Sequence, residues 1–191
     1  SSATGTQYLQ AVGCAIAATR TGNKEVVYVS SGEGSTSEGD FHEALNWSSR
    51  DRLPIIFHIQ DNKYAISVHI SDQIAGSVYD ISAGYEHLAR FQVDGTNFFE
   101  SHLAFEKAVD RARKGKGPSI IVSDVVRLLP HSSSDDQTKY RSKNELTADL
   151  DRDPILSLKR ECIEKRIIRE KEFETIDEEI NQRVNKETEW A

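Results

Sequence analysis

The sequence predicts an α/β fold, in which helices flank a mainly parallel sheet and a helical tail follows. Two observations favour this fold. Short runs rich in β-branched and aromatic residues alternate with helical patterns over residues 1–150, as in chains that form parallel sheets. These runs are continuously apolar, which is typical of strands buried on both faces of such a sheet. The alternation stops after residue 150, so we expect a domain over residues 1–150 and a charged helical tail over residues 151–191.

The elements of the expected domain follow from local patterns. The spacing of small and apolar side chains predicts a helix over residues 6–20, with Thr4 or Thr6 as its N-cap. Strands are expected at residues 25–30, 53–59, 91–93 and 119–126, and further helices at residues 38–50 and 100–114. Gly115 and Pro118 end the last of these helices just before the final strand.

The segment that follows the last strand is different in character. Residues 128–144 are polar and show no periodicity, so they form either a functional loop or a disordered one. Asp153 and Pro154 are a typical cap and first-turn pair, and they predict a helical tail that runs to Trp190. Its apolar stripe is sparse and does not keep heptad spacing, which favours a solvated helix with a docking seam over a coiled coil.

Composition excludes several classes of protein. The 191 residues carry 24 Lys and Arg against 31 Asp and Glu, a net charge of −7, which argues against a nucleic-acid or anionic-membrane surface. No apolar run approaches the roughly 20 residues of a membrane helix, and the N-terminus lacks the pattern of a secretory signal. Cys14 and Cys162 are far apart and are expected to be reduced thiols. The sequence contains no methionine, even at position 1, so we expect a domain that is incomplete at its N-terminus.

Two short motifs follow neighbouring predicted strands. Residues 32–34 read Gly-Glu-Gly after the strand at 25–30, and residues 60–62 read Gln-Asp-Asn after the strand at 53–59. The carboxyl ends of parallel strands are where open α/β sheets bind ligands. Glu33 and Asn62 offer hard oxygen donors suited to Mg²⁺ or Ca²⁺. The flanking glycines allow a phosphate to approach, provided that a cation bridges it to Glu33. Alternatively, Glu33 only caps the helix that follows.

A second candidate site lies at the start of the polar loop. Arg127 ends the last predicted strand, and His131 follows it by four residues. Together these side chains are able to direct a guanidinium and an imidazole at a phosphate. Alternatively, the serine-rich stretch after them is a solvated surface loop. The other histidines have no metal-ligand spacing and are interpreted as packing or surface residues.

Three separated segments resemble one enzyme family. EGDFHEALNWSS, RLPIIFHIQDNKYAIS and VRLLPHSSSDDQTKYR, with Gly-Glu-Gly and Asp-Asn separated by residues 35–60, resemble the α subunit of the decarboxylating component of 2-oxoacid dehydrogenase complexes. The branched-chain (2-oxoisovalerate) type is most similar, and the resemblance extends from Ser1 to about Ala148. It implies a thiamine diphosphate-binding fold, thiamine diphosphate and Mg²⁺ as cofactors, and oxidative decarboxylation of a 2-oxo acid with acyl transfer to a lipoyl group.

Alternatives to this activity stay open. One is the α subunit of a pyruvate or acetoin dehydrogenase, and another is a non-catalytic assembly paralogue of the same fold. A nucleotide-binding Rossmann protein is disfavoured because no G-x-G-x-x-G follows the first strand.

The resemblance also implies roles for individual residues. Mg²⁺ is bound by the side chains of Glu33 and Asn62 and by the backbone carbonyl of Tyr64. Arg127 neutralises the diphosphate, and His131 contacts the cofactor and takes part in acyl transfer. The remaining implied cofactor contacts are Ser2, Thr4, Gly32, Gly34, Ser35, Ala65 and Ile66.

Some positions depart from the family pattern or extend it. Gln60 stands where the branched-chain type has an arginine, which predicts diphosphate binding weakened by roughly 1.5–3 kcal/mol, the value of one charged hydrogen bond. Glu33 replaces the commoner Asp, and Asp61 replaces the first Asn of the second motif. Ser132 aligns with a serine that kinases phosphorylate in eukaryotic relatives, where a phosphate adds negative charge beside the cofactor.

The implied assembly is larger than this chain. Thr6 and Gln7 match residues that bind a structural K⁺ ion in branched-chain relatives. The expected partners are a β subunit or fused β portion, which supplies the glutamate that activates the cofactor, and a lipoyl-bearing acyltransferase. The chain alone is therefore expected to bind the cofactor weakly and to be catalytically inactive. No nucleic-acid or membrane partner is expected. The implied compartment is the cytoplasm of a bacterium or, in a eukaryote, the mitochondrial matrix.

Overall fold

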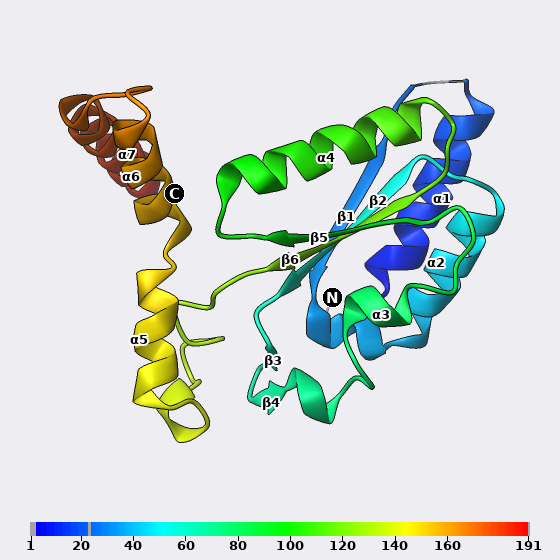
Figure 1. Cartoon of the computed structure of the whole chain (residues 1–191), viewed down its shortest axis with the longest axis horizontal. Coiled ribbons are helices and arrows are strands. Elements are labelled where there is room, and N and C mark those ends of the chain that lie inside the picture. The colour runs from blue at the N-terminus through cyan, green and yellow to red at the C-terminus, as the bar shows by residue number, and fades with distance from the viewer. Residues whose placement is uncertain (1–2, 23, 191) are drawn as a thin grey trace.

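The computed structural model describes residues 3–22 and 24–190 and shows a parallel sheet with helices on both faces (Figure 1). The sheet has four strands in the order β1-β2-β6-β5, and all three neighbouring pairs are parallel. The strands are β1 (Val27–Gly32), β2 (Ile55–Asp61), β5 (Ala89–Asp94) and β6 (Ser119–Asp124). The predicted α/β fold is therefore confirmed.

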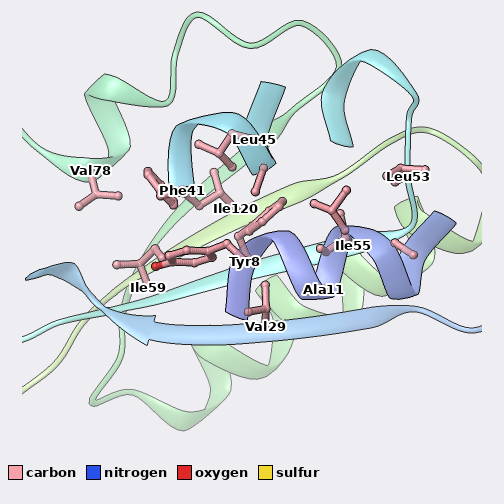
Figure 2. Close-up of a cluster of buried hydrophobic side chains, with 14 of the residues drawn as sticks. Tyr8, Ala11, Val29, Phe41, Leu45, Leu53, Ile55, Ile59, Val78 and Ile120 are labelled. Carbon is pink, nitrogen blue, oxygen red and sulfur yellow. The ribbon is translucent and has the colours of Figure 1, made fainter. Parts of the chain in front are cut away.

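Two helices cover one face of the sheet and one helix covers the other. Helices α1 (Gln7–Arg20) and α2 (Gly39–Arg50) bury their apolar side chains against one side of β2 and β6, while α4 (Phe98–Arg113) packs on the opposite side. The larger core lies beneath α1 and α2, where the ring of Tyr8 contacts Phe41 (Figure 2). The same ring also lies against Phe57. Because side chains alternate between the faces of a strand, Ile55 and Phe57 face this core while Ile56 faces α4.

The central strands are buried on both faces as predicted, but β1 is not. Tyr28 is 53 % exposed because β1 lies at the edge of the sheet, although one side of its ring contacts Phe105 of α4. Thr6 takes the N-cap position of α1, as expected, but its side chain does not cap the helix. Its backbone is already helical, and its hydroxyl donates to the carbonyl of Ala3 (3.2 Å) instead of accepting from the helix.

Smaller elements connect the strands to the candidate motifs. They are the 3₁₀ segments η1 (Glu33–Ser37), η2 (Ile70–Asp72) and η3 (Gln137–Lys139), the short strands β3 (Tyr64–Ala65) and β4 (Val68–His69), and helix α3 (Val78–Ile81). Strands β3 and β4 form a separate antiparallel pair. The hairpin follows β2 directly, so it starts at the carboxyl edge of the main sheet.

The C-terminal part is helical, as predicted. It contains α5 (Lys143–Asp151), α6 (Pro154–Glu164) and α7 (Glu170–Trp190), which lie to one side of the sheet in Figure 1. Arg152, directly after α5, pairs with Asp94 and Asp124 at the ends of β5 and β6 (3.3 Å each). Asp153 caps α6 by accepting from the backbone N–H groups of Ile155 and Leu156, with Pro154 in the first turn. Helix α5 begins within the polar stretch, earlier than the tail predicted from the sequence. No helix in the described part of the chain is both long and apolar enough to span a membrane.

Candidate cofactor-binding site

The Gly-Glu-Gly motif (residues 32–34) and the Gln-Asp-Asn motif (residues 60–62) lie side by side at the carboxyl edge of the sheet. Strands β1 and β2 pair in parallel with Gly32 opposite Gln60. Glu33 therefore leaves the sheet beside Asp61 and Asn62, although the two motifs are far apart in sequence. The register of two parallel strands is what brings them together.

The carboxylate of Glu33 is buried and only half satisfied. The residue is 1 % exposed, and its Oε2 accepts from the backbone N–H of Asn62 at 3.2 Å, while Oε1 has no hydrogen-bond partner among the described residues. Burial raises the pKa of Glu33 above its ordinary value, and hydrogen bonds from backbone N–H groups oppose this in part. The alternative that Glu33 only caps the next α-helix is wrong, because α2 begins at Gly39 after a cap position at Glu38.

The loop after β2 holds its polar groups in a fixed arrangement. Asn62 Oδ1 accepts from the backbone N–H of Tyr64 at 3.1 Å. Lys63 and Ile66 both have left-handed backbone angles, with φ of 71° and 56°. This bond closes a local turn, in which the side chain of Asn62 contacts the backbone of the residue two positions later in the chain. Short polar side chains commonly stabilise turns in this way.

Gly34 allows the two motif loops to approach each other. A Cβ atom at this position would lie 2.6 Å from the Cβ of Ala65 and 3.4 Å from its Cα. The glycine is thus required by close packing between η1 and β3.

We expect Gly34→Ala to destabilise the protein by about 1–3 kcal/mol, the usual cost of overpacking, because Ala65 has no flexible side chain that is able to move aside. The free energy of unfolding in urea measures this effect. Gly39→Ala is the matched control, since a Cβ there meets no atom within 4 Å. Equal stability of the two variants would contradict the close approach.

Arg127 joins the last strand to the same loop. Its Nη1 donates to the carbonyl of Ile66 at 2.8 Å, and its Nη2 donates to the hydroxyl of Tyr140 at 2.7 Å. The guanidinium lies near the rings of Tyr64 and Tyr140, with 5.6 and 5.7 Å from its carbon to the ring centroids. Its Nε is buried without a partner among the described residues. An unpaired donor on a fixed guanidinium is suited to an anion such as a phosphate.

The loop that carries His131 is ordered by a chain of hydrogen bonds from Arg127. Tyr140 accepts from Arg127 and donates to Asp135 Oδ2 (2.6 Å), which also accepts from the backbone N–H of His131 at 2.9 Å. These two donated bonds hold the pKa of Asp135 below its ordinary value. The imidazole of His131 and the hydroxyl of Ser132 lie on the exposed part of this loop. The polar stretch is therefore structured and connected to the site.

The remaining residues suggested by the sequence are placed less directly. Ser35 is buried, and its hydroxyl bonds to Tyr8 (2.8 Å) and donates to the carbonyl of Gly32 (2.9 Å), so it supports the turn that contains Glu33. Thr4 is exposed and Gln7 is the first residue of α1. Ser2 lies outside the described residues.

The unpartnered atoms test which group fits this edge of the sheet. Five buried side-chain polar atoms lack partners among the described residues, and two of them are Glu33 Oε1, an acceptor, and Arg127 Nε, a donor. The acceptor, with the amide oxygen of Asn62, suits a hard divalent cation, and the donor suits an anion bound to it. No group of three or more His, Cys, Asp or Glu residues with metal-binding geometry occurs in the described part. Two oxygen donors fit a hard divalent cation that keeps further ligands, as Mg²⁺ does with water.

Comparison with known protein families shows to which one the chain belongs. All of residues 1–191 match the family model described as dehydrogenase E1 component. The chain belongs to this family. It is 36 % identical over 187 residues to the 2-oxoisovalerate dehydrogenase subunit alpha of Bacillus subtilis, covering 97 % of this chain and 56 % of that protein. It is 41 % identical over 152 residues to the 3-methyl-2-oxobutanoate dehydrogenase subunit alpha of Mycobacterium tuberculosis, covering 79 % and 41 %.

This E1 chain also resembles a second kind of relative. It is 36 % identical over 157 residues to a pyruvate dehydrogenase E1 component subunit alpha of Staphylococcus aureus, covering 82 % of this chain and 42 % of that one. A transketolase from Campylobacter jejuni shares the fold, with a TM-score of 0.54 and 22 % identity over 61 % of this chain and 19 % of the other. The chain therefore spans about half the length of the curated relatives it matches.

Sequence reasoning missed a buried arginine that holds the polar loop in place. Arg141 is 5 % exposed and donates to the carbonyl of Arg127 (3.0 Å), to Gln137 Oε1 (3.2 Å) and to Glu145 Oε1 (2.9 Å), and it also pairs with Asp149. It thereby ties the loop to the start of α5. The only signal in the sequence was a Tyr-Arg pair at the end of a polar stretch.

Proposed function

We propose that this E1 chain anchors Mg²⁺ and thiamine diphosphate in the oxidative decarboxylation of a 2-oxo acid, with transfer of the acyl group to a lipoyl carrier. The observation that carries the proposal is the unpartnered Oε1 of Glu33, buried beside Asn62 at the carboxyl edge of the sheet. Branched-chain names among the relatives favour 2-oxoisovalerate as substrate, while a pyruvate dehydrogenase relative supports pyruvate as the alternative.

Each residue in the proposed site has a defined task. Glu33, Asn62 and the backbone carbonyl of Tyr64 hold Mg²⁺, and Arg127 binds the diphosphate through its free donor. Glycine at position 32 leaves room for the diphosphate beside the backbone, while Gly34 lets the loop approach Ala65. The bound cofactor supplies the electron sink that decarboxylation requires.

The loop residues act on the substrate side of the proposed site. His131 is positioned through Asp135 and Tyr140, and it presents its imidazole for hydrogen bonding during acyl transfer to the lipoyl group. Ser132 is exposed on the same loop and is open to modification. Gln60, also exposed, adds no charge at the strand end. Diphosphate neutralisation therefore depends on Arg127 and the cation.

The proposed assembly includes a β subunit or β portion and a lipoyl-bearing acyltransferase. K⁺ binding by Thr6 and Gln7, and cofactor contacts by Thr4, Ala65 and Ile66, belong to the same proposal. The relatives named above are bacterial, so we place the enzyme in a bacterial cytoplasm.

The test is turnover by the complete α and β protein with an artificial electron acceptor. We expect 2-oxoisovalerate to be decarboxylated with a higher kcat/KM than pyruvate, and EDTA to abolish the activity until Mg²⁺ is restored. A preference for pyruvate would favour the alternative substrate. Normal cofactor binding without turnover of any 2-oxo acid would favour a non-catalytic assembly role.

A further inference from the structure

The turn between the proposed metal ligands Asn62 and Tyr64 contains a lysine in an unusual backbone conformation. Lys63 has a φ of 71°, in the left-handed region that favours glycine. A residue with a side chain is strained in this conformation, whereas glycine is not. The contacts of its ammonium group indicate what offsets the strain.

Lys63 contacts Asp61 through both its side chain and its backbone. Its Nζ lies 2.8 Å from Asp61 Oδ2, and its backbone N–H donates to Asp61 Oδ1 at 3.0 Å. Asp61 is 4 % exposed, so its carboxylate requires a charged or hydrogen-bonding partner in the fold. Lys63 provides this partner to both carboxylate oxygens.

The same ammonium group reaches the neighbouring strand. Asp124 lies opposite Asp61 in the register of β2 and β6, and its Oδ1 is 3.3 Å from Lys63 Nζ. The carbonyl of Lys63 accepts from the backbone N–H of Ile70 at 2.9 Å. The turn is thus fixed to the ends of two strands on one side and to η2 on the other.

This fixed turn sets the direction of the groups beside it. The backbone N–H of Asn62 donates to Glu33, and Asn62 in turn accepts from the backbone N–H of Tyr64. A shift of Lys63 would move both neighbours, because they share its peptide bonds.

We propose that Lys63 is a positioning residue, whose ion pairs with Asp61 and Asp124 hold the turn that directs Asn62 and Tyr64 at the cation, and that Asp61 is its counter-ion and not a metal ligand. The proposal rests on the proposed function of this site. Its rival is direct ligation by Asp61. Against the rival, both oxygens of Asp61 are engaged by Lys63, whereas Glu33 Oε1 is free of partners among the described residues.

Two measurements on the complete enzyme test the proposal. One is the dissociation constant of Mg²⁺ in the presence of thiamine diphosphate, and the other is the amide exchange rate of residues 62–66 without cofactor. We expect Lys63→Met to raise the dissociation constant roughly tenfold, as loss of a partner behind a metal ligand does, and to speed the exchange. Lys63→Arg keeps the positive charge of the side chain. Its Mg²⁺ dissociation constant and amide exchange rate are expected to match those of the parent.

A double substitution distinguishes a positioning role of Lys63 from a simple effect of its charge. In Asp61→Asn with Lys63→Met the ion pair is lost while the charge of the pair stays balanced, so we expect both readouts to remain within about threefold of those of Lys63→Met. If Lys63 acted only through its charge, Lys63→Met would have the opposite effect, because removing an ammonium group near the site strengthens Mg²⁺ binding. Lys63→Gly relieves the backbone strain and is still expected to bind more weakly. Lys114→Met, which breaks an exposed 2.7 Å ion pair with Asp110 in α4, is the control without effect.

Several results would overturn the proposal. These are tighter Mg²⁺ binding by Lys63→Met, parental binding by Lys63→Gly, or a loss of about 100-fold or more in Asp61→Asn alone, which would make Asp61 a ligand. Failure of the proposed function is distinguishable, because the parent then shows no Mg²⁺-dependent cofactor binding. The amide exchange of the cofactor-free variants still decides whether Lys63 holds the turn.

Discussion

Replacing Glu33 with glutamine is expected to weaken Mg²⁺-dependent binding of thiamine diphosphate by about 100-fold or more. Glutamine keeps the shape of the side chain and an oxygen to accept from Asn62, but it removes the negative charge that faces the cation. Loss of a partner behind a metal ligand already costs 10–100-fold, so the loss of a charged ligand is placed at the upper end or beyond. Equilibrium dialysis of the cofactor with and without Mg²⁺ measures the effect.

The same substitution is expected to stabilise the cofactor-free protein at neutral pH. The folded pKa of Glu33 lies above its ordinary value of 4.5, chiefly because burial disfavours the charged form. Below that pH the carboxyl is protonated in both the folded and the unfolded state. As the pH rises through the raised folded pKa, the folded protein loses stability relative to the unfolded chain. We therefore expect the stability advantage of Glu33→Gln to appear over this rise in pH.

Glu43→Gln is the matched control for both measurements, because Glu43 is an exposed carboxylate on α2. It is expected to change neither cofactor binding nor the pH dependence of unfolding. Parental cofactor affinity in Glu33→Gln would show that the cation is bound elsewhere. A loss of stability at neutral pH would show that the buried carboxylate has a structural partner.

The sequence predicted the sheet well because its central strands are apolar on both faces. Residues 53–59 and 119–126 correspond to β2 and β6, which are covered by helices on either side. The exposure of Tyr28 was not predictable from its own segment, because it depends on the sheet order.

The parts of the candidate site that depend on strand ends and motif spacing were predictable from the sequence. Glu33 and Asn62 were expected to lie together because parallel strands end at one edge, and the register of β1 and β2 places them there. The helix-cap alternative at Glu33 was excluded only by where α2 begins. Contacts that depend on side chains folding back, such as the ion pair of Asp61 with Lys63, have no periodicity to reveal them.

Arg141→Met is expected to open the loop that carries His131. Arg141 is buried, and its removal takes a donor from the carboxylates of Glu145 and Asp149 and from the carbonyl of Arg127, although Glu145 still accepts from the hydroxyl of Tyr64 (3.3 Å). Breaking a buried ion pair by removing one partner costs roughly 3–5 kcal/mol. The lower end applies because the side chain of Glu145 is 37 % exposed and is able to regain water. This corresponds to a rise on the order of 100-fold in the open population of the loop.

Amide exchange over residues 128–144 measures this opening, and cofactor affinity measures its consequence. Arg169→Met is the control, because Arg169 forms an exposed pair with Glu172 in the tail and such pairs contribute little. Unchanged exchange in Arg141→Met would contradict the role of Arg141.

The network of Arg141 lies outside both apolar clusters of the core, so the sheet is expected to stay folded when the loop opens. The contrast matters because Arg127 depends on this loop at two points, through its own carbonyl and through the hydroxyl of Tyr140. If the loop opens, Arg127 loses the geometry that directs its free donor toward the diphosphate. Cofactor binding is therefore expected to weaken in Arg141→Met even though Arg141 touches neither the cation nor the proposed diphosphate position. A loop that opens without any loss of affinity would mean that the bonds to Ile66 and the stacking on Tyr64 suffice to hold Arg127.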